Sequence, residues 1–209
     1  MACLDLRDYL TALDAAGELH RVAAQVDPHL VAGAISQRLA ERGGPAVHFQ
    51  KPKGAAHGIS LASGLMGRGN AGLWSRMAVA LDLPAKAEYR QVRDEVQRRC
   101  ESPIRPLQVA SGPCKEIVIS GRAVDLQSLA APMLHEGDGG RYLTSWAFMV
   151  VAEPDSGYVA WDLIPMMVLS KTTLSGCLSP DTNVGRIYRD KYAATGKPMP
   201  FAIVFGGPP

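Results

Sequence analysis

The sequence predicts an α+β protein in which an α/β module, residues 1–105, precedes a small β-barrel with one crossing helix, residues 106–209. Helix-period and strand-period segments alternate in the first half of the chain, whereas strand patterns dominate the second half. A stretch with three prolines, Glu101–Pro113, separates the two halves. With 209 residues, 47% hydrophobic and 20% charged, the composition is that of an ordinary globular protein.

The first module contains capping residues and glycine or proline stops around each expected helix. Asp5 or Asp8 opens the first helix, and Asp27-Pro28 opens the second, which Gly43-Gly44 ends. The expected elements are, in order, a helix from Asp5 or Asp8 to Gly17, a strand at His20–Val26, a helix from Pro28 to Gly43, strands at Pro45–Gln50 and His57–Ser63, and helices at Asn70–Leu83 and Ala85–Arg99.

The second module contains apolar and β-branched runs that predict strands. The expected strands are Lys115–Ser120, Arg141–Ala152, Tyr158–Ser170 and Pro200–Gly206. Pro154, Asp155 and Gly157 suit a tight reversal, so the second and third of these strands are expected to form a long hairpin. A helix is expected at Val184–Thr195, with Gly196 as its C-cap.

Charge and cysteine usage exclude several function classes. The net charge of +2 gives no electrostatic basis for binding nucleic acid or an anionic membrane. No apolar run approaches the roughly 20 residues of a membrane helix, and the N-terminus lacks the pattern of a secretory signal. The four cysteines are scattered without a C-x-x-C pair, which argues against a zinc cluster. We therefore expect a cytoplasmic protein with reduced thiols.

Three segments resemble the UbiD family of decarboxylases. They are LRDYLTALDAAGELHRV near the N-terminus, PMLHEGDGGRYLT at Pro132–Thr144, and the run from there to GGPP. The resemblance implies a split flavin-binding barrel and carboxy-lyase activity on aromatic or α,β-unsaturated acids. It also implies prenylated flavin mononucleotide (prenylated FMN) held by a divalent metal. A homo-oligomer or a subunit of a larger assembly is expected.

The resemblance also implies cofactor-binding positions. They are Ser145, Trp161, Asp162, Leu163, Ile164 and Thr182. Ser145 takes the place of a threonine near the flavin, but a polar strand residue is an equally good interpretation. Asp162 is also explained as a turn or bulge residue at a strand end.

The sequence departs from the family pattern where metal and substrate are held. Ala160 and Asn183 stand at the family's asparagine and histidine metal ligands, and Pro165 stands at its substrate-binding arginine. A methyl group cannot ligate a cation, and proline offers neither a charge nor a donor. The family's further metal-binding and catalytic glutamates correspond to sequence beyond Pro209. We therefore assign no catalytic residue and no metal ligand in this chain.

Three other features of the sequence each allow a functional and a purely structural interpretation. His135, Glu136 and Asp138 form either a metal-binding or acid–base cluster or a loop at the barrel mouth. The loop with Gly64, Gly67, Gly69 and Gly72 either cradles a phosphate or is simply flexible. The basic residues Arg186, Arg189 and Lys191 either contact an anion or form a solvated helix face.

Four functional hypotheses remain open at this stage. In the first, the chain is a degenerate family member repurposed for another reaction, or for binding a small apolar or aromatic ligand. In the second, it is a non-catalytic accessory subunit. In the third, a second chain completes an active decarboxylase. In the fourth, the sequence is a gene fragment without a function of its own.

Overall fold

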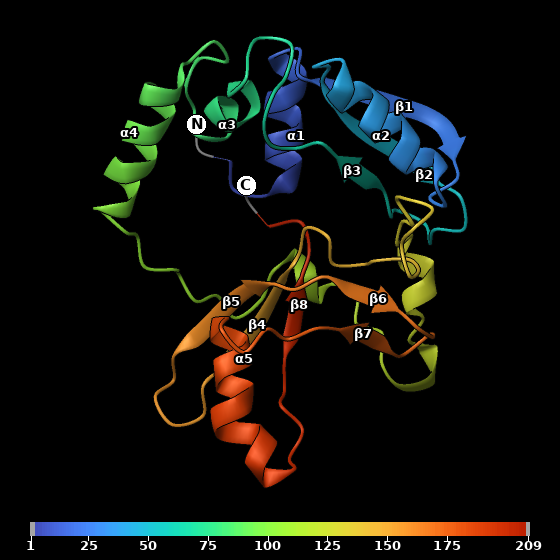
Figure 1. Cartoon of the computed structure of the whole chain (residues 1–209), viewed down its shortest axis with the longest axis vertical. Helices are drawn as coiled ribbons and strands as arrows, with labels where there is room; N and C mark the ends of the chain where they lie inside the picture. Colours follow the sequence, from blue (N-terminus) through green and yellow to red (C-terminus); the bar gives the residue numbers. More distant parts are fainter. Residues whose placement is uncertain (1–2, 208–209) are drawn as a thin grey trace.

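The computed structural model describes residues 3–207, and Figure 1 shows two modules, one above the other. The upper, N-terminal module covers residues 3–100. It contains, in order, α1 (Leu6–Ala15), β1 (Leu19–Val26), α2 (Val31–Glu41), β2 (Ala46–Pro52), β3 (Leu61–Ser63), α3 (Ser75–Ala80) and α4 (Tyr89–Cys100). β1 and β2 pair in parallel, with α2 as the crossover between them, and β3 adds antiparallel to β2.

The lower, C-terminal module is built from two small sheets and one α-helix. Its elements are β4 (Phe148–Ala152), β5 (Val159–Leu163), β6 (Met166–Val168), β7 (Leu174–Gly176), α5 (Asn183–Ile187) and β8 (Ala202–Val204). α5 continues as a π-helical turn (Tyr188–Tyr192) and a 3₁₀ turn (Ala193–Thr195), and two 3₁₀ turns, Gly121–Ala123 and Leu126–Leu129, precede β4. One sheet has the order β5-β4-β8, and β6 pairs with β7 in the other. α5 packs on the three-stranded sheet, where Met149, Val151, Ala160, Val184 and Ile187 form a buried cluster.

The chain segment 128–134 joins the two modules. His29 and Met133 form a parallel bridge, and the amide of Leu30 donates to the Met133 carbonyl at 2.8 Å. A Cβ atom on Gly33 would lie 2.3 Å from the Leu134 carbonyl oxygen. α2 therefore sits against this segment so closely that only glycine fits at the contact.

Most expected elements are present, and the structure explains where their bounds differ. The carboxylate of Asp5 caps α1, accepting from the Asp8 amide at 2.9 Å. α2 begins at Val31, not at Pro28, because the Asp27 side chain accepts the His29 amide in a turn instead of capping a helix. α3 is shorter than expected, and Gly196 ends the last helical turns with φ +65° as predicted.

Three strand predictions need correction. The expected strand Arg141–Ala152 is a strand only at Phe148–Ala152, because the amides of Tyr142 and Leu143 donate to the carbonyls of Pro132 and Met166 outside that sheet. The expected strand Lys115–Ser120 is irregular after a 3₁₀ turn at Pro113–Lys115, and Ile117, Val118 and Ile119 are exposed. The expected strand Tyr158–Ser170 is two strands, β5 and β6, because Pro165 has no amide for a ladder. The β4–β5 hairpin is confirmed, with Val150 opposite Trp161.

Candidate functional site

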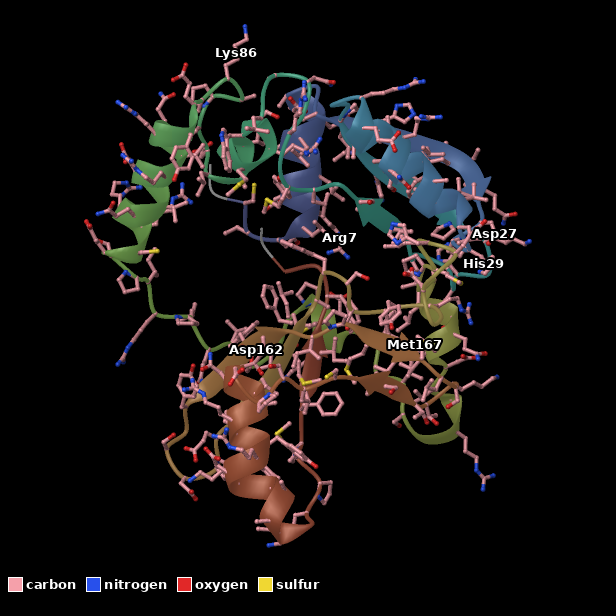
Figure 2. All side chains as sticks on the ribbon, in the orientation of Figure 1. Arg7, Asp27, His29, Lys86, Asp162 and Met167 are labelled. Carbon is pink, nitrogen blue, oxygen red and sulfur yellow. The ribbon has the colours of Figure 1, made fainter. Side chains whose placement is uncertain are left out.

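The first turn of α5 collects three of the polar residues singled out in the sequence. The Asp162 carboxylate accepts the Val184 amide at 2.6 Å, and Figure 2 shows Asp162 just above the start of α5. The Thr182 hydroxyl accepts the Gly185 amide at 3.0 Å and donates to the Ser179 carbonyl at 2.9 Å. The Asn183 side chain accepts a hydrogen bond from Arg186. Asp162 and Thr182 thus act as helix caps.

The segment around Pro165 is fixed by a buried hydroxyl. Thr144 is 2% exposed, and its hydroxyl donates to the Ile164 carbonyl at 2.5 Å. The same oxygen accepts the Met166 amide at 2.7 Å. Thr144 therefore satisfies the backbone groups on both sides of Pro165, which itself offers no donor.

The remaining predicted site residues do not meet at one place. Ala160 is fully buried against the core. Ile164 is also buried there, and it lines a cavity of about 360 Å³ within the C-terminal module. Trp161 and Leu163 point to the opposite, exposed face of the sheet. There the rings of Trp161 and Phe148 pack edge to face, with their centroids 5.9 Å apart. Ser145 lies apart from all of them, in a cavity between the modules.

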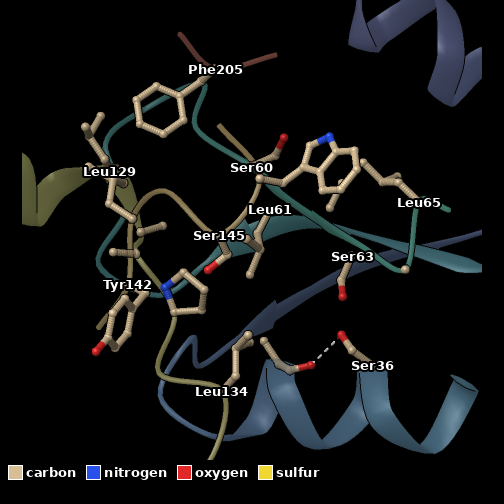
Figure 3. A pocket seen from close by; sticks show the side chains of 18 of the residues that line it. Ser36, Ser60, Leu61, Ser63, Leu65, Leu129, Leu134, Tyr142, Ser145 and Phe205 are labelled. Atoms are coloured by element: carbon tan, nitrogen blue, oxygen red, sulfur yellow. Dashed lines mark hydrogen bonds between the residues drawn. The ribbon is translucent and has the colours of Figure 1, made fainter. Parts of the chain in front are cut away.

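This inter-module cavity has a volume of about 320 Å³. Its wall is formed by β3 and the loop that follows it, by residues of the joining segment 128–134, and by the chain just before β4 (Figure 3). Phe205, near the C-terminus, also lines the cavity. No charged or histidine side chain lines it within the described residues 3–207. Figure 3 shows Ser63 and Ser36 pointing toward each other, with Ser145 between Leu61 and Tyr142.

The glycine-rich loop binds an anion that belongs to the protein itself. Glu18 is fully buried, and its carboxylate accepts the amides of Asn70 at 2.9 Å and Ala71 at 2.7 Å. A Cβ atom on Gly69 would lie 1.9 Å from that carboxylate. The amides that could cradle a phosphate are therefore already occupied. Nothing in the sequence around Glu18 signals this role, because its partners lie 52 and 53 residues further along the chain.

A buried arginine lies next to the same loop. Arg76 is 4% exposed and donates to the Gly44 carbonyl at 2.9 Å. Burial lowers the pKa of its guanidinium, and the nearby Glu18 charge opposes that shift. The Tyr9 hydroxyl lies 2.6 Å from the Leu65 carbonyl and 2.9 Å from that of Arg76. Leu65 also lines the inter-module cavity, so this buried cluster fixes one side of the cavity wall.

The other polar groups singled out in the sequence are engaged in local contacts. Asp138 accepts the amides of His135 and Leu134 at 3.0 and 3.1 Å, and these bonds lower the pKa of its carboxyl, which is typical of a loop turn. The basic residues of the last helical turns pair as Arg189 with Asp190 and Lys191 with Glu153. Residues 3–207 contain no group of three or more histidine, cysteine or acidic side chains suited to a metal, and no helix there is long and apolar enough to cross a membrane.

Family matches cover both modules. Residues 105–209 match the 3-octaprenyl-4-hydroxybenzoate carboxy-lyase Rift-related domain, and residues 10–96 match the N-terminal domain of the same carboxy-lyase. The chain belongs to the UbiD family. This confirms the resemblance noted in the sequence.

Two relatives of the chain are named as decarboxylases. Over its full length the chain is 33% identical to the pyrrole-2-carboxylic acid decarboxylase of Pseudomonas aeruginosa. Over 99% of its length it is 31% identical to ferulic acid decarboxylase 1 of Saccharomyces cerevisiae. The chain spans 42% of the length of each of these relatives.

Solved UbiD-class structures share the fold. The closed form of the vanillic acid decarboxylase of Sedimentibacter hydroxybenzoicus superposes with a TM-score of 0.87 at 27% identity, covering 100% of this chain and 44% of that one. An evolved dimeric form of the UbiD-class enzyme HmfF of Pelotomaculum thermopropionicum, in complex with prenylated FMN, gives a TM-score of 0.81 at 25% identity. The match covers 98% of this chain and 45% of the HmfF chain.

Proposed function

We propose that this chain does not decarboxylate acids by itself and that it has a small-molecule role different from the parent reaction. The observation that carries the proposal is the contact set of Ala160, Pro165 and Asn183. Ala160 is fully buried in the core, and the backbone around Pro165 is held by Thr144. The Asn183 amide oxygen is engaged by Arg186.

These contacts do not fit a metal-held flavin phosphate. A hard divalent cation needs several oxygen or nitrogen ligands, and a methyl group supplies none. Asp162 is the acidic residue nearest in sequence to Ala160, but its carboxylate caps α5. A carboxylate substrate needs a cationic fork, and proline cannot supply one. Ser145, Trp161, Leu163 and Ile164 remain proposed flavin contacts only for a chain that is completed by other residues.

The direct test is loading followed by turnover. Purified protein is incubated with prenylated FMN and Mn²⁺, separated from free cofactor, and assayed with ferulic and pyrrole-2-carboxylic acids. The P. aeruginosa relative serves as the positive control. We expect no retained flavin absorbance and no release of CO₂. Turnover by this chain alone would overturn the proposal.

A second candidate is a decarboxylase completed by another polypeptide. It is favoured by the outer face of the three-stranded sheet, which we define as Phe148, Val150, Val159, Trp161 and Leu163. The three β5 members of this face are 45–55% exposed. A solvated sheet face normally carries polar residues, and apolar patches of this kind mark contacts with other chains. One structure of the Sedimentibacter decarboxylase, ShVdcCD, includes a truncated ShVdcD component.

Light scattering and mass spectrometry of the purified material separate the two candidates. The second candidate predicts a further chain in stoichiometric amount, and flavin retention only when that chain is present. A monodisperse monomer at high concentration, with no copurifying chain, would count against it.

A further inference from the structure

The inter-module cavity differs from the other cavity in the way it is lined. The cavity inside the C-terminal module is bounded mainly by Met149, Ile164, Met166 and other members of the apolar cluster, so it is an incompletely filled core. The inter-module cavity instead has aromatic side chains at its opening and hydroxyl groups within. Trp146 and Phe205, at 52% and 47% exposure, are accessible to an entering molecule.

Two hydroxyl groups of this cavity are free to bind a ligand. The Ser36 hydroxyl donates to the Ala32 carbonyl at 2.8 Å, and Ser60 is engaged with His48. The hydroxyls of Ser63 and Ser145 make no hydrogen bond to any other residue within the described range 3–207, whereas the Tyr142 hydroxyl points away from both serines (Figure 3). Each serine hydroxyl can both donate and accept, so together they suit a ligand that carries a hydroxyl or ether oxygen.

Because no charged side chain lines the described wall, the cavity favours an uncharged ligand over a charged one. A carboxylate placed in this cavity would lose its water and gain no cationic partner, which is strongly unfavourable. An uncharged ring suffers no such penalty, and it gains contact with the aromatic and aliphatic side chains. A volume of about 320 Å³ is at the small end of ligand pockets, which run from roughly 300 to 1,000 Å³.

We propose that the inter-module cavity binds an uncharged, hydroxylated aromatic molecule of one ring. The ring lies against Trp146, Phe205 and the leucines of the wall, and its oxygen meets Ser145 and Ser63. This inference rests on the proposed small-molecule role and adds the place and the ligand class. It separates this chain from relatives named for acids, since the cavity prefers the ring without its carboxylate.

Calorimetric titration with guaiacol and vanillic acid tests the proposal, because the two compounds differ only by a carboxylate. We expect guaiacol to bind at least about tenfold more tightly at pH 7. The variants Ser145→Ala and Ser63→Ala each weaken guaiacol binding about three- to tenfold, the size of one neutral hydrogen bond. Ser175→Ala, in the other cavity, is the matched control and leaves binding unchanged.

Tryptophan fluorescence locates the ligand independently. Guaiacol is expected to shift the emission of the native chain and of Trp161→Phe, but not that of Trp146→Phe. The proposal is overturned by equal or tighter binding of vanillic acid, by a loss in Ser175→Ala but not in Ser145→Ala, or by no saturable guaiacol binding. Circular dichroism establishes that each variant is folded. Turnover by flavin-loaded protein would refute the proposed function, while the titration would still decide this inference.

Discussion

At the scale of single residues, Glu18 is the group on which the glycine-rich loop depends. It is fully buried, accepts two backbone amides and lies close to the buried Arg76. We expect Glu18→Ala to lower the free energy of unfolding by about 3 kcal/mol, because two backbone amides lose their acceptor and Arg76 loses the favourable charge near it. Urea denaturation measures the change.

Two comparisons make the Glu18 prediction specific. Asp14→Ala removes an exposed carboxylate from an ion pair with Arg21 and is expected to cost less than about 1 kcal/mol. Added formate should partly restore Glu18→Ala by filling the vacated anion site, but should not affect the native protein. Equal losses in Glu18→Ala and Asp14→Ala would show that the buried carboxylate has no special role.

Glu153 gives the β4–β5 turn a dependence on pH. Hydrogen bonds from Ser156 and Lys191 lower the pKa of its carboxyl to about 2, from an ordinary value of 4.5. A lowered pKa in the folded state means stabilisation that is complete above pH 4.5 and is lost as the pH falls toward 2. We expect the melting temperature of the native chain to exceed that of Glu153→Gln at pH 6, and the gap to close on acidification.

The comparison with Glu153→Gln is needed because Glu95 titrates over the same range. Arg98 and Arg99 lower the pKa of Glu95 to about 2 as well, so the native curve alone contains both contributions. Glu116→Gln, at an exposed position just after the 3₁₀ turn Pro113–Lys115, is the control and should follow the native curve. A gap between the native chain and Glu153→Gln that stays constant from pH 6 to pH 2 would contradict the assignment.

At the scale of elements, α5 is held by a contact that only glycine allows. A Cβ atom on Gly185 would lie 1.9 Å from the Ser179 carbonyl oxygen, which itself accepts the Thr182 hydroxyl. We expect Gly185→Ala to cost about 2–3 kcal/mol despite the better helix propensity of alanine. Arg186→Ala, one residue on and exposed, should stay within about 0.5 kcal/mol. Thermal unfolding by circular dichroism compares the two variants.

Local patterns predicted most elements, and the failures arise from contacts between residues distant in sequence, except for the strand break at Pro165, which is local. The caps Asp5 and Gly196 and the β4–β5 hairpin are set by residues close in sequence, so they could be predicted. Lys115–Ser120 has the composition of a strand but no paired strand, and pairing is not encoded locally. The Asp162 cap on α5 joins residues 22 apart, so its role could not be predicted from a motif position.

At the scale of the whole molecule, the inter-module cavity exists only because the modules meet. Its wall takes residues from Leu6 to Gly206, a combination that no single segment of the sequence reveals. The junction runs along α2 and the segment 128–134, where Gly33 meets the Leu134 carbonyl. The position of that segment therefore decides both the docking of the modules and the shape of the cavity.

Gly33→Ala is expected to disrupt this junction while leaving each module folded. The added methyl would lie 2.3 Å from a backbone oxygen, so the segment 128–134 must move away from α2. Overpacking of this kind costs about 1–3 kcal/mol, which outweighs the gain of up to about 1 kcal/mol from alanine in a helix. We expect a lower melting temperature together with loss of guaiacol binding, since Leu129 and Leu134 line the cavity.

The control for Gly33→Ala is Gly112→Ala, where an added Cβ would meet nothing within 4 Å. It should retain both the melting temperature and the guaiacol affinity of the native chain. Far-ultraviolet circular dichroism of Gly33→Ala should stay native, because Leu134, the residue that must move away, lies in no helix or strand and alanine is compatible with the helix α2. Guaiacol binding that survives unchanged in Gly33→Ala would mean that the cavity does not depend on the junction between the modules.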